Sequence, residues 1–247
     1  MRLRVRSGVL VAAAVTTLVG ISAAQAAEPV PAKSEDGKPY IGGVWLIEAP
    51  QAELKTVAGK APPLLPKAAQ LYAKRKQSKV AGKTADDPVA QCLPDGVPRL
   101  LSANRPIQIL QKPKQITVLY ETNHQSRLFY IDDPMPKGDD LPDPTYNGTS
   151  IARWAGNALV VDTLSFNDLT WLDDSGLPHS QALRVVERYE LADADHLRVN
   201  VTVTDPEMFS APWQMQLTFK RQPGRRLQEN ACAEKLWNPP GGTGNAG

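Results

Sequence analysis

The sequence predicts an all-β, mainly antiparallel protein, an up-and-down β-barrel with one N-terminal helical segment. Three observations support this fold class. Apolar and polar residues alternate with period two from Ile116 onward, turns rich in Gly, Asn and Asp separate the alternating segments, and 247 residues leave room for one large all-β domain. Alternation of period two places successive side chains on opposite faces of a strand. Such strands form an antiparallel meander, and closing the meander removes its exposed edges.

The alternating segments can be followed along the chain. The predicted strands are residues 116–120, 127–132, 149–154, 158–164, 183–189, 197–203 and 213–219. Ala155-Gly156-Asn157 is a credible hairpin turn between two of them. Residues 66–79 follow prolines and are rich in Ala, Lys, Gln and Leu, which predicts one amphipathic helix across the outside of the domain.

The N-terminus has the three parts of an export signal. Arg2, Arg4 and Arg6 precede the apolar run 8–24, and an A-x-A cleavage site ends at Ala26. We therefore expect cleavage after Ala26 and a periplasmic mature protein, with an uncleaved N-terminal anchor as the alternative. No later stretch approaches the roughly 20 apolar residues that a membrane-spanning helix needs, so we expect no membrane insertion after cleavage.

The remaining sequence predicts a single domain between two tails. Residues 27–39 and 238–247 are polar or rich in Pro and Gly, so we expect both to be disordered, on either side of a barrel domain at 40–237. Removing the three signal arginines changes the formal charge of +2 to −1, because that segment contains no acidic residue. A nearly neutral surface argues against nucleic acid as a partner.

The two cysteines predict a disulfide. Cys92 and Cys232 are the two cysteines of the chain, and two thiols in an oxidising compartment are more often paired than free. The bond would tie the C-terminal segment to the start of the folded body. Two isolated thiols are the alternative.

The densest polar segment is residues 166–180, which combines a histidine, three aspartates, an amide and a tryptophan. His179 is the candidate general acid or base, because imidazole changes charge near neutral pH. Asp162 or Asp173 would orient its ring, and Asn167 would steady developing charge. A solvent-exposed loop, in which Asp and Asn cap turns, would show the same residue types.

Two charged residues fall on faces that we expect to point inward. Glu187 shares its face with Tyr189, and Arg127 shares its face with Phe129. We expect an internal Arg127–Glu187 pair, either as a buried salt bridge or as a group that orients a ligand. Trp171 and Trp213 are candidate stacking walls for a ligand, although core packing explains them equally well.

Strand direction predicts where a site lies. If neighbouring strands run alternately up and down, the short links 123–126, 155–157 and 192–195 share one end of the barrel. The long links 133–148, 165–180 and 205–211 then share the other end, where binding or catalysis is expected. The sequence contains no nucleotide-binding fingerprint, no C-x-x-C and no metal-binding spacing, so we predict neither a cofactor nor a metal site.

One part of the chain resembles a known family. The motifs are Leu159-Val160-Val161-Asp162-Thr163, Phe166-Asn167-Asp168, Thr170-Trp171-Leu172-Asp173, Pro178-His179-Ser180, Glu187-Arg188 and the earlier Cys92-Leu93-Pro94-Asp95-Gly96-Val97-Pro98-Arg99. Together they resemble a family of exported bacterial proteins of unknown function, which implies export but no activity. Gly43-Val44-Trp45 resembles the Gly-x-Trp of the first strand in lipocalin-like barrels.

Three functions fit these observations. The first is periplasmic binding of a small apolar or aromatic molecule in a barrel pocket, with Arg127 and Glu187 supplying internal polarity. The second is a cofactor-independent hydrolase, lyase or isomerase that uses His179, and it requires that ring within hydrogen-bond reach of a carboxylate. The third is a structural envelope protein, which requires a barrel filled with side chains.

Overall fold

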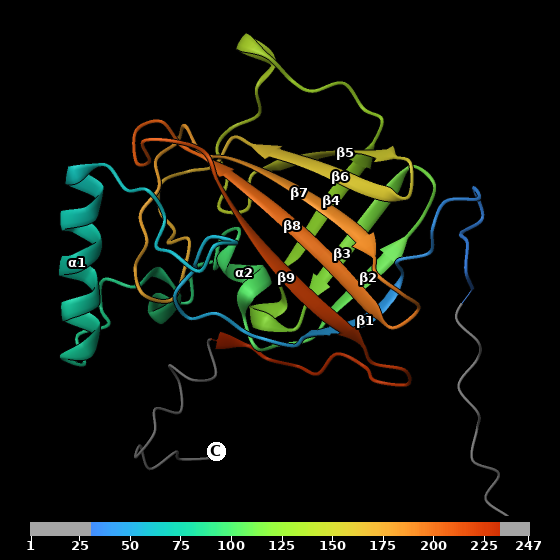
Figure 1. Cartoon of the computed structure of the whole chain (residues 1–247), viewed down its shortest axis with the longest axis horizontal. Helices are drawn as coiled ribbons and strands as arrows, with labels where there is room; N and C mark the ends of the chain where they lie inside the picture. The colour runs from blue at the N-terminus through green and yellow to red at the C-terminus, as the bar shows by residue number, and fades with distance from the viewer. Residues whose placement is uncertain (1–30, 233–247) are drawn as a thin grey trace, which may run out of the picture.

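The computed structural model describes residues 31–232 and shows a closed barrel of nine strands (Figure 1). The strands are β1 (Gly43–Ile47), β2 (Ile107–Gln111), β3 (Gln115–Tyr120), β4 (Ser126–Ile131), β5 (Thr149–Ala155), β6 (Ala158–Leu164), β7 (Arg184–Leu191), β8 (His196–Thr204) and β9 (Trp213–Arg221). The helices are α1 (Pro66–Val80) and α2 (Arg99–Ser102), with short 3-10 turns η1 (Pro88–Gln91), η2 (Thr122–His124) and η3 (Gly138–Asp140). The predicted lipocalin-like fold class, including its helical segment, is confirmed.

Alternation identifies the buried face of most strands. Along β8, Leu197, Val199 and Val201 are buried between residues that are exposed or half-buried. The sequence analysis does not predict β2. Its five residues alternate only through Ile107 and Ile109 before Leu110 reverses the pattern on the exposed side.

The barrel is antiparallel except at one seam. β4 pairs with β5 in parallel over three residue pairs, from Phe129–Ser150 to Ile131–Ala152. Residues 132–148 therefore run back along the barrel, and β5 begins to pair at Phe129, in the middle of β4. The predicted ends of two links are wrong. The link 123–126 was expected opposite the long loops, but η2, which contains His124, lies at the same end as the loops 165–183 and 205–212. The link 133–148 was expected to lie with those loops, but residue 133 lies at the opposite end.

Side chains fill the barrel interior. Trp45, Phe129 and Tyr189 are 0–1% exposed, and Val201 and Met215 are fully buried. A side chain with no exposed area touches no space wide enough for a water molecule. The region beside these five residues is therefore a packed core, as is common in small barrels.

We call the end of the barrel with η2 and the loops 165–183 and 205–212 the loop end. α1 and the disulfide also lie there. α1 lies outside the barrel at this end, as Figure 1 shows, and it confirms the predicted helix. Cys92 and Cys232 form the predicted disulfide, with their Cα atoms 5.4 Å apart. No helix among residues 31–232 is long and apolar enough to cross a membrane.

Part of the expected N-terminal tail is folded. Residues 31–39 form a turn in which Lys33 bridges to Pro39, and the N–H of Gly37 donates to the carbonyl of Ser34. The predicted signal peptide at 1–26 and the predicted tail at 238–247 lie outside the described residues.

Gly148 bends the chain away from β4 just before β5 begins. Its φ is +66°, a conformation that costs other L-residues about 1–2 kcal/mol. A Cβ atom at this position would also lie 2.7 Å from the carbonyl oxygen of Leu164. Both facts favour glycine here. β5 then pairs with β4 only from Phe129 onward, so residues 126–128 have no partner in β5.

We predict that Gly148→Ala destabilises the protein more than Gly156→Ala. Gly156 has a similar φ of +63°, but nothing lies within 4 Å of a Cβ built there. The control therefore carries the backbone cost alone, whereas Gly148→Ala adds a clash with Leu164. Urea denaturation should show a difference in unfolding free energy of about 1 kcal/mol or more. Equal losses would contradict the steric role of Gly148.

Candidate functional site

A buried ion pair lies inside the barrel. Arg127 Nη1 donates to Glu187 Oε1 at 2.9 Å, and Nη2 donates to Oε2 at 2.5 Å. The side chains are 1% and 0% exposed. The predicted Arg127–Glu187 pair is thus present. Tyr189 donates its hydroxyl to Glu187 at 2.7 Å, and the hydroxyls of Ser150 and Thr163 accept from Arg127 Nη2.

Two donors in this cluster have no hydrogen-bond partner among residues 31–232. They are the Nε–H of Arg127 and the hydroxyl of Tyr120, and both are buried. Burial raises the pKa of Tyr120 to about 12, so its hydroxyl stays protonated at neutral pH. For Arg127, burial lowers the pKa but the adjacent Glu187 carboxylate outweighs it, and the pKa is raised well above its ordinary value. A buried donor without a partner is costly, so both atoms require an explanation.

A pocket of about 360 Å³ lies over the β4–β5 seam. Its lining includes the outward-facing Ser126, Leu128 and Tyr130 of β4. Arg127 and Ser150 also belong to the lining, but their side chains are buried in the internal cluster. The full lining is Pro94, Ser126, Arg127, Leu128, Tyr130, Thr145, Tyr146, Asn147, Gly148, Thr149 and Ser150. We call this the seam pocket. It lies on the outer surface of the barrel, and the internal ion pair is buried behind it.

Backbone groups also face the seam pocket. The N–H of Tyr120 donates to Gln125, and the N–H of Ile131 donates to Lys114. In an antiparallel ladder of this phase, Ser126 and Leu128 direct their backbone groups away from β3 and toward β5. β5 pairs with β4 only from Ser150 onward, so the first residues of β4 border the pocket.

Asn147 completes the wall opposite β4. Its Nδ2 lies 3.4 Å from Gln125 Oε1, and its buried Oδ1 has no partner among the described residues. Gln125 is fixed in turn by Asp95, whose N–H donates to Oε1 and whose carboxylate accepts from Nε2 at 2.5 Å. Asp95 follows Pro94 of the pocket wall, and burial raises the pKa of its carboxyl group.

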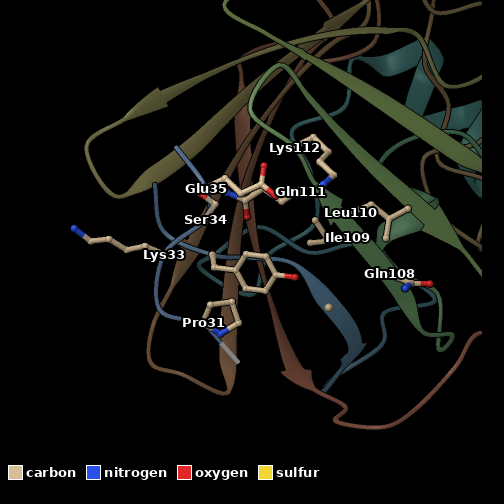
Figure 2. A pocket seen from close by; sticks show the side chains of 11 residues that line it. Pro31, Lys33, Ser34, Glu35, Gln108, Ile109, Leu110, Gln111 and Lys112 are labelled. Atoms are coloured by element: carbon tan, nitrogen blue, oxygen red, sulfur yellow. Dashed lines mark ion pairs between the residues drawn. The ribbon is translucent and has the colours of Figure 1, made fainter. Parts of the chain in front are cut away.

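A larger hollow of about 580 Å³ lies between the N-terminal segment and β2 (Figure 2). Figure 2 shows Glu35 and Lys112 close together at one side of it, and these residues form an ion pair of 3.5 Å. Their side chains are 76% and 72% exposed. Charges so well hydrated bind a ligand weakly, and the hollow reaches no buried polar group, so we do not place the site here.

His179 does not contact a carboxylate. Its Nε2 lies 2.7 Å from the hydroxyl of Thr170, and its Nδ1 lies 3.1 Å from the carbonyl oxygen of Ser180. A carbonyl only accepts, so Nδ1 carries the proton and Nε2 accepts from Thr170. Burial lowers the pKa of His179 and favours this neutral form. Both ring nitrogens are therefore occupied by structural hydrogen bonds.

The two candidate partner aspartates lie elsewhere. Asp173 accepts from the backbone N–H groups of Leu54, Ser175 and Leu177 and from the hydroxyl of Tyr72. Its carboxylate thus fixes the loop and α1. Asp162, the other candidate to orient the His179 ring, lies on the outer face of β6 and pairs with Arg184, whose Nε donates at 2.8 Å. The structure does not bring the predicted catalytic residues together.

The predicted stacking residues are packed. Trp171 is 4% exposed, and the guanidinium of Arg75 lies 5.0 Å from its ring centroid. Trp213 is 3% exposed and packs edge-on against Phe209 at 5.6 Å. Asn167 accepts from the N–H of Leu169. None of these three residues lines the seam pocket, where the sequence reasoning missed Tyr130, Asn147 and Ser150. The Asn147-Gly148 pair, which is typical of turns, was the sequence signal that could have located the turn just before β5.

No protein-family model matches the chain, and no curated protein sequence matches it. Membership of the exported bacterial family therefore stays a prediction. Solved structures do match. The chain is similar to REP1-NXSQ, a fatty acid transporter, at 13% identity and a TM-score of 0.34, over 74% of this chain and 97% of that one. It is also similar to a mutant of the fluorescent protein UnaG, at 13% identity and a TM-score of 0.32, over 74% and 96%. Likeness at this level says nothing of the ligand.

We predict that Glu187→Gln destabilises the protein by about 3 kcal/mol or more, because it leaves the Arg127 charge buried without compensation. The control is Glu190→Gln on the same strand, whose pair with Arg188 spans 3.7 Å and is about two-fifths exposed on each side. That change should cost less than about 1 kcal/mol. Chemical denaturation measures both.

A double variant guards against failure of the single variant to fold. Arg127→Met with Glu187→Leu removes both charges, and it should recover much of the stability lost in Glu187→Gln. A Glu187→Gln protein as stable as the Glu190→Gln control would contradict the buried pair.

Proposed function

We propose that this protein is exported to the periplasm and binds a small molecule in the seam pocket. The observation that carries the proposal is the position of that pocket, a hollow of mixed polar and apolar lining where β4 is not paired with β5 before Phe129. A concave site with a few convergent polar groups is the usual form of a small-molecule site. The two tight hydrogen bonds to Glu187 hold Arg127 in place before a ligand arrives.

The seam pocket also has apolar surface for a ligand. Leu128 is 40% exposed and Tyr130 is 37% exposed, and both line the outer wall. An apolar or aromatic ring of a ligand would cover them, and its polar group would meet the exposed hydroxyl of Ser126 in the same lining. This places the ligand in the wall of the barrel, since side chains occupy the interior beside Phe129 and Tyr189.

A structural envelope protein is the second candidate, and one observation favours it. The complete burial of Tyr189, Val201 and Met215 is what a barrel without a central ligand requires. The proposed catalytic use of His179 has less support, because Thr170 and Ser180 occupy its ring nitrogens.

Blocking the seam pocket tests the proposal. Ser126 is exposed on the pocket wall, so Ser126→Trp should fill the pocket without disturbing the core. Gln214→Trp is the control, because Gln214 is exposed on the outer face of β9. The chain from Ala27 to the C-terminus is screened by thermal shift against sugars, fatty acids, aromatic acids and amines. We expect a compound that raises the melting temperature of the wild-type and Gln214→Trp proteins but not that of Ser126→Trp.

Two results would contradict the proposal. A compound that stabilises Ser126→Trp as well as the wild type binds elsewhere. If no compound of any class shifts the melting temperature, the structural candidate replaces binding.

A further inference from the structure

We propose that the seam pocket binds a short extended peptide, whose backbone pairs with the open edge of β4 at residues 126–128. The inference rests on the proposed function, since it names the ligand class of the same pocket. Three observations support it: the direction of the backbone groups along β4, the partners that these groups lack, and the exposed apolar side chains of the same strand.

The first observation is the direction of the backbone groups. Asp132 follows the last residue of β4, and its N–H donates to the carbonyl of Ala152 in β5. The backbone groups of a strand change sides from one residue to the next, so Tyr130, Leu128 and Ser126 point the same way. These three residues of β4 therefore direct their N–H and C=O groups toward β5 and the seam pocket.

The second observation is that three of these backbone groups have no partner. β5 pairs with β4 only from Phe129 onward, so the N–H of Leu128 and both backbone groups of Ser126 lie beyond the ladder. No group among residues 31–232 forms a hydrogen bond with any of the three. Leu128 is 40% exposed and Ser126 is also exposed, and both line the pocket. A ligand in the pocket can therefore reach this edge.

The three groups have the spacing of a strand edge. A donor, an acceptor and a second donor follow one another from Ser126 to Leu128, over about 6.6 Å at the rise of a strand. An extended peptide repeats its N–H and C=O at the same two-residue interval, so one ligand residue can donate to Ser126 and accept from Leu128. A carboxylate only accepts, an ammonium only donates, and an acyl chain does neither. A peptide is the class whose repeat matches the edge.

The third observation concerns the side chains beside the open edge. Leu128 and Tyr130 face outward and are 40% and 37% exposed. Paired strands place their side chains on the same two faces, so outward side chains of the ligand would stand beside Leu128 and Tyr130. Arg127 is the one charged residue in the pocket lining, and it is buried and paired with Glu187. We therefore expect an uncharged peptide of about three residues with apolar outward side chains.

Calorimetric titration of the full mature chain with Ac-Leu-Ala-Leu-NH2 tests the inference. We expect binding that Leu128→Pro weakens on the order of tenfold or more, because proline has no N–H to donate to the ligand. That N–H takes no part in the ladder with β3, and proline is tolerated at a strand edge where the N–H faces solvent. Leu128→Val is the matched control. It keeps the N–H and an apolar side chain, so it should lose no more than about fourfold.

A modified peptide guards against failure of Leu128→Pro to fold. In it, the nitrogens of all three residues carry methyl groups, so the side chains remain but no residue can donate to the carbonyl of Ser126. We expect this peptide to bind the wild-type protein on the order of tenfold more weakly than the unmodified peptide.

The outcomes separate the inference from the proposed function. Peptide binding that falls with Leu128→Pro or with methylation, and persists in Leu128→Val, supports both. Equal binding of the methylated and unmodified peptides overturns the pairing with β4, and the seam pocket stays the site if Ser126→Trp abolishes that binding. If the peptide does not bind but another compound does, and Ser126→Trp abolishes its binding, the peptide inference is overturned and the proposed function is retained. Peptide binding unchanged in both Leu128→Pro and Ser126→Trp overturns both.

Discussion

The buried Arg127–Glu187 pair is the interaction on which the rest of the barrel depends. Two charges with almost no exposed surface are stable only when each finds hydrogen-bond partners and water is kept out. Tyr189 on one side and Ser150 with Thr163 on the other supply those partners. Ser150 and Thr163 belong to β5 and β6, so the pair needs the barrel to be closed across the β4–β5 seam. Three residue pairs achieve that closure.

The same seam explains why the candidate site lies in the wall of the barrel. Gly148 lines the pocket just before β5 begins, and Thr145, three residues earlier, pairs with Phe166 and not with β4. The opposite rim is Pro94, two residues after Cys92 in the disulfide. Asp95 and Gln125 then connect this segment to Asn147 through hydrogen bonds. Packing, disulfide and hydrogen bonds thus hold both sides of the pocket, and such preorganisation is what a binding site requires.

The sequence predicted the barrel and its internal pair, because alternation shows which residues of a strand share a face. Arg127 and Glu187 alternate with exposed or half-buried neighbours, so their direction was readable. The face on which Asp162 lies was not readable, because residues 158–161 are apolar on both faces of β6. The parallel seam was not predictable, since alternation carries no information on strand direction. His179 and Asp173 were chosen for their chemistry alone, and only the tertiary contacts show that both hold the loop.

The central claim is that the binding site lies at the seam between β4 and β5. Nuclear magnetic resonance of the ¹⁵N-labelled mature chain, titrated with a compound that raises its melting temperature, tests it most directly, because the backbone N–H of Leu128 and the Nε–H of Arg127 each give their own signal. We expect these two signals to shift together, while the indole signal of Trp213, which is buried at the loop end, stays in place. Shifts at Trp213 or in residues 165–183, with Leu128 and Arg127 unchanged, would contradict it.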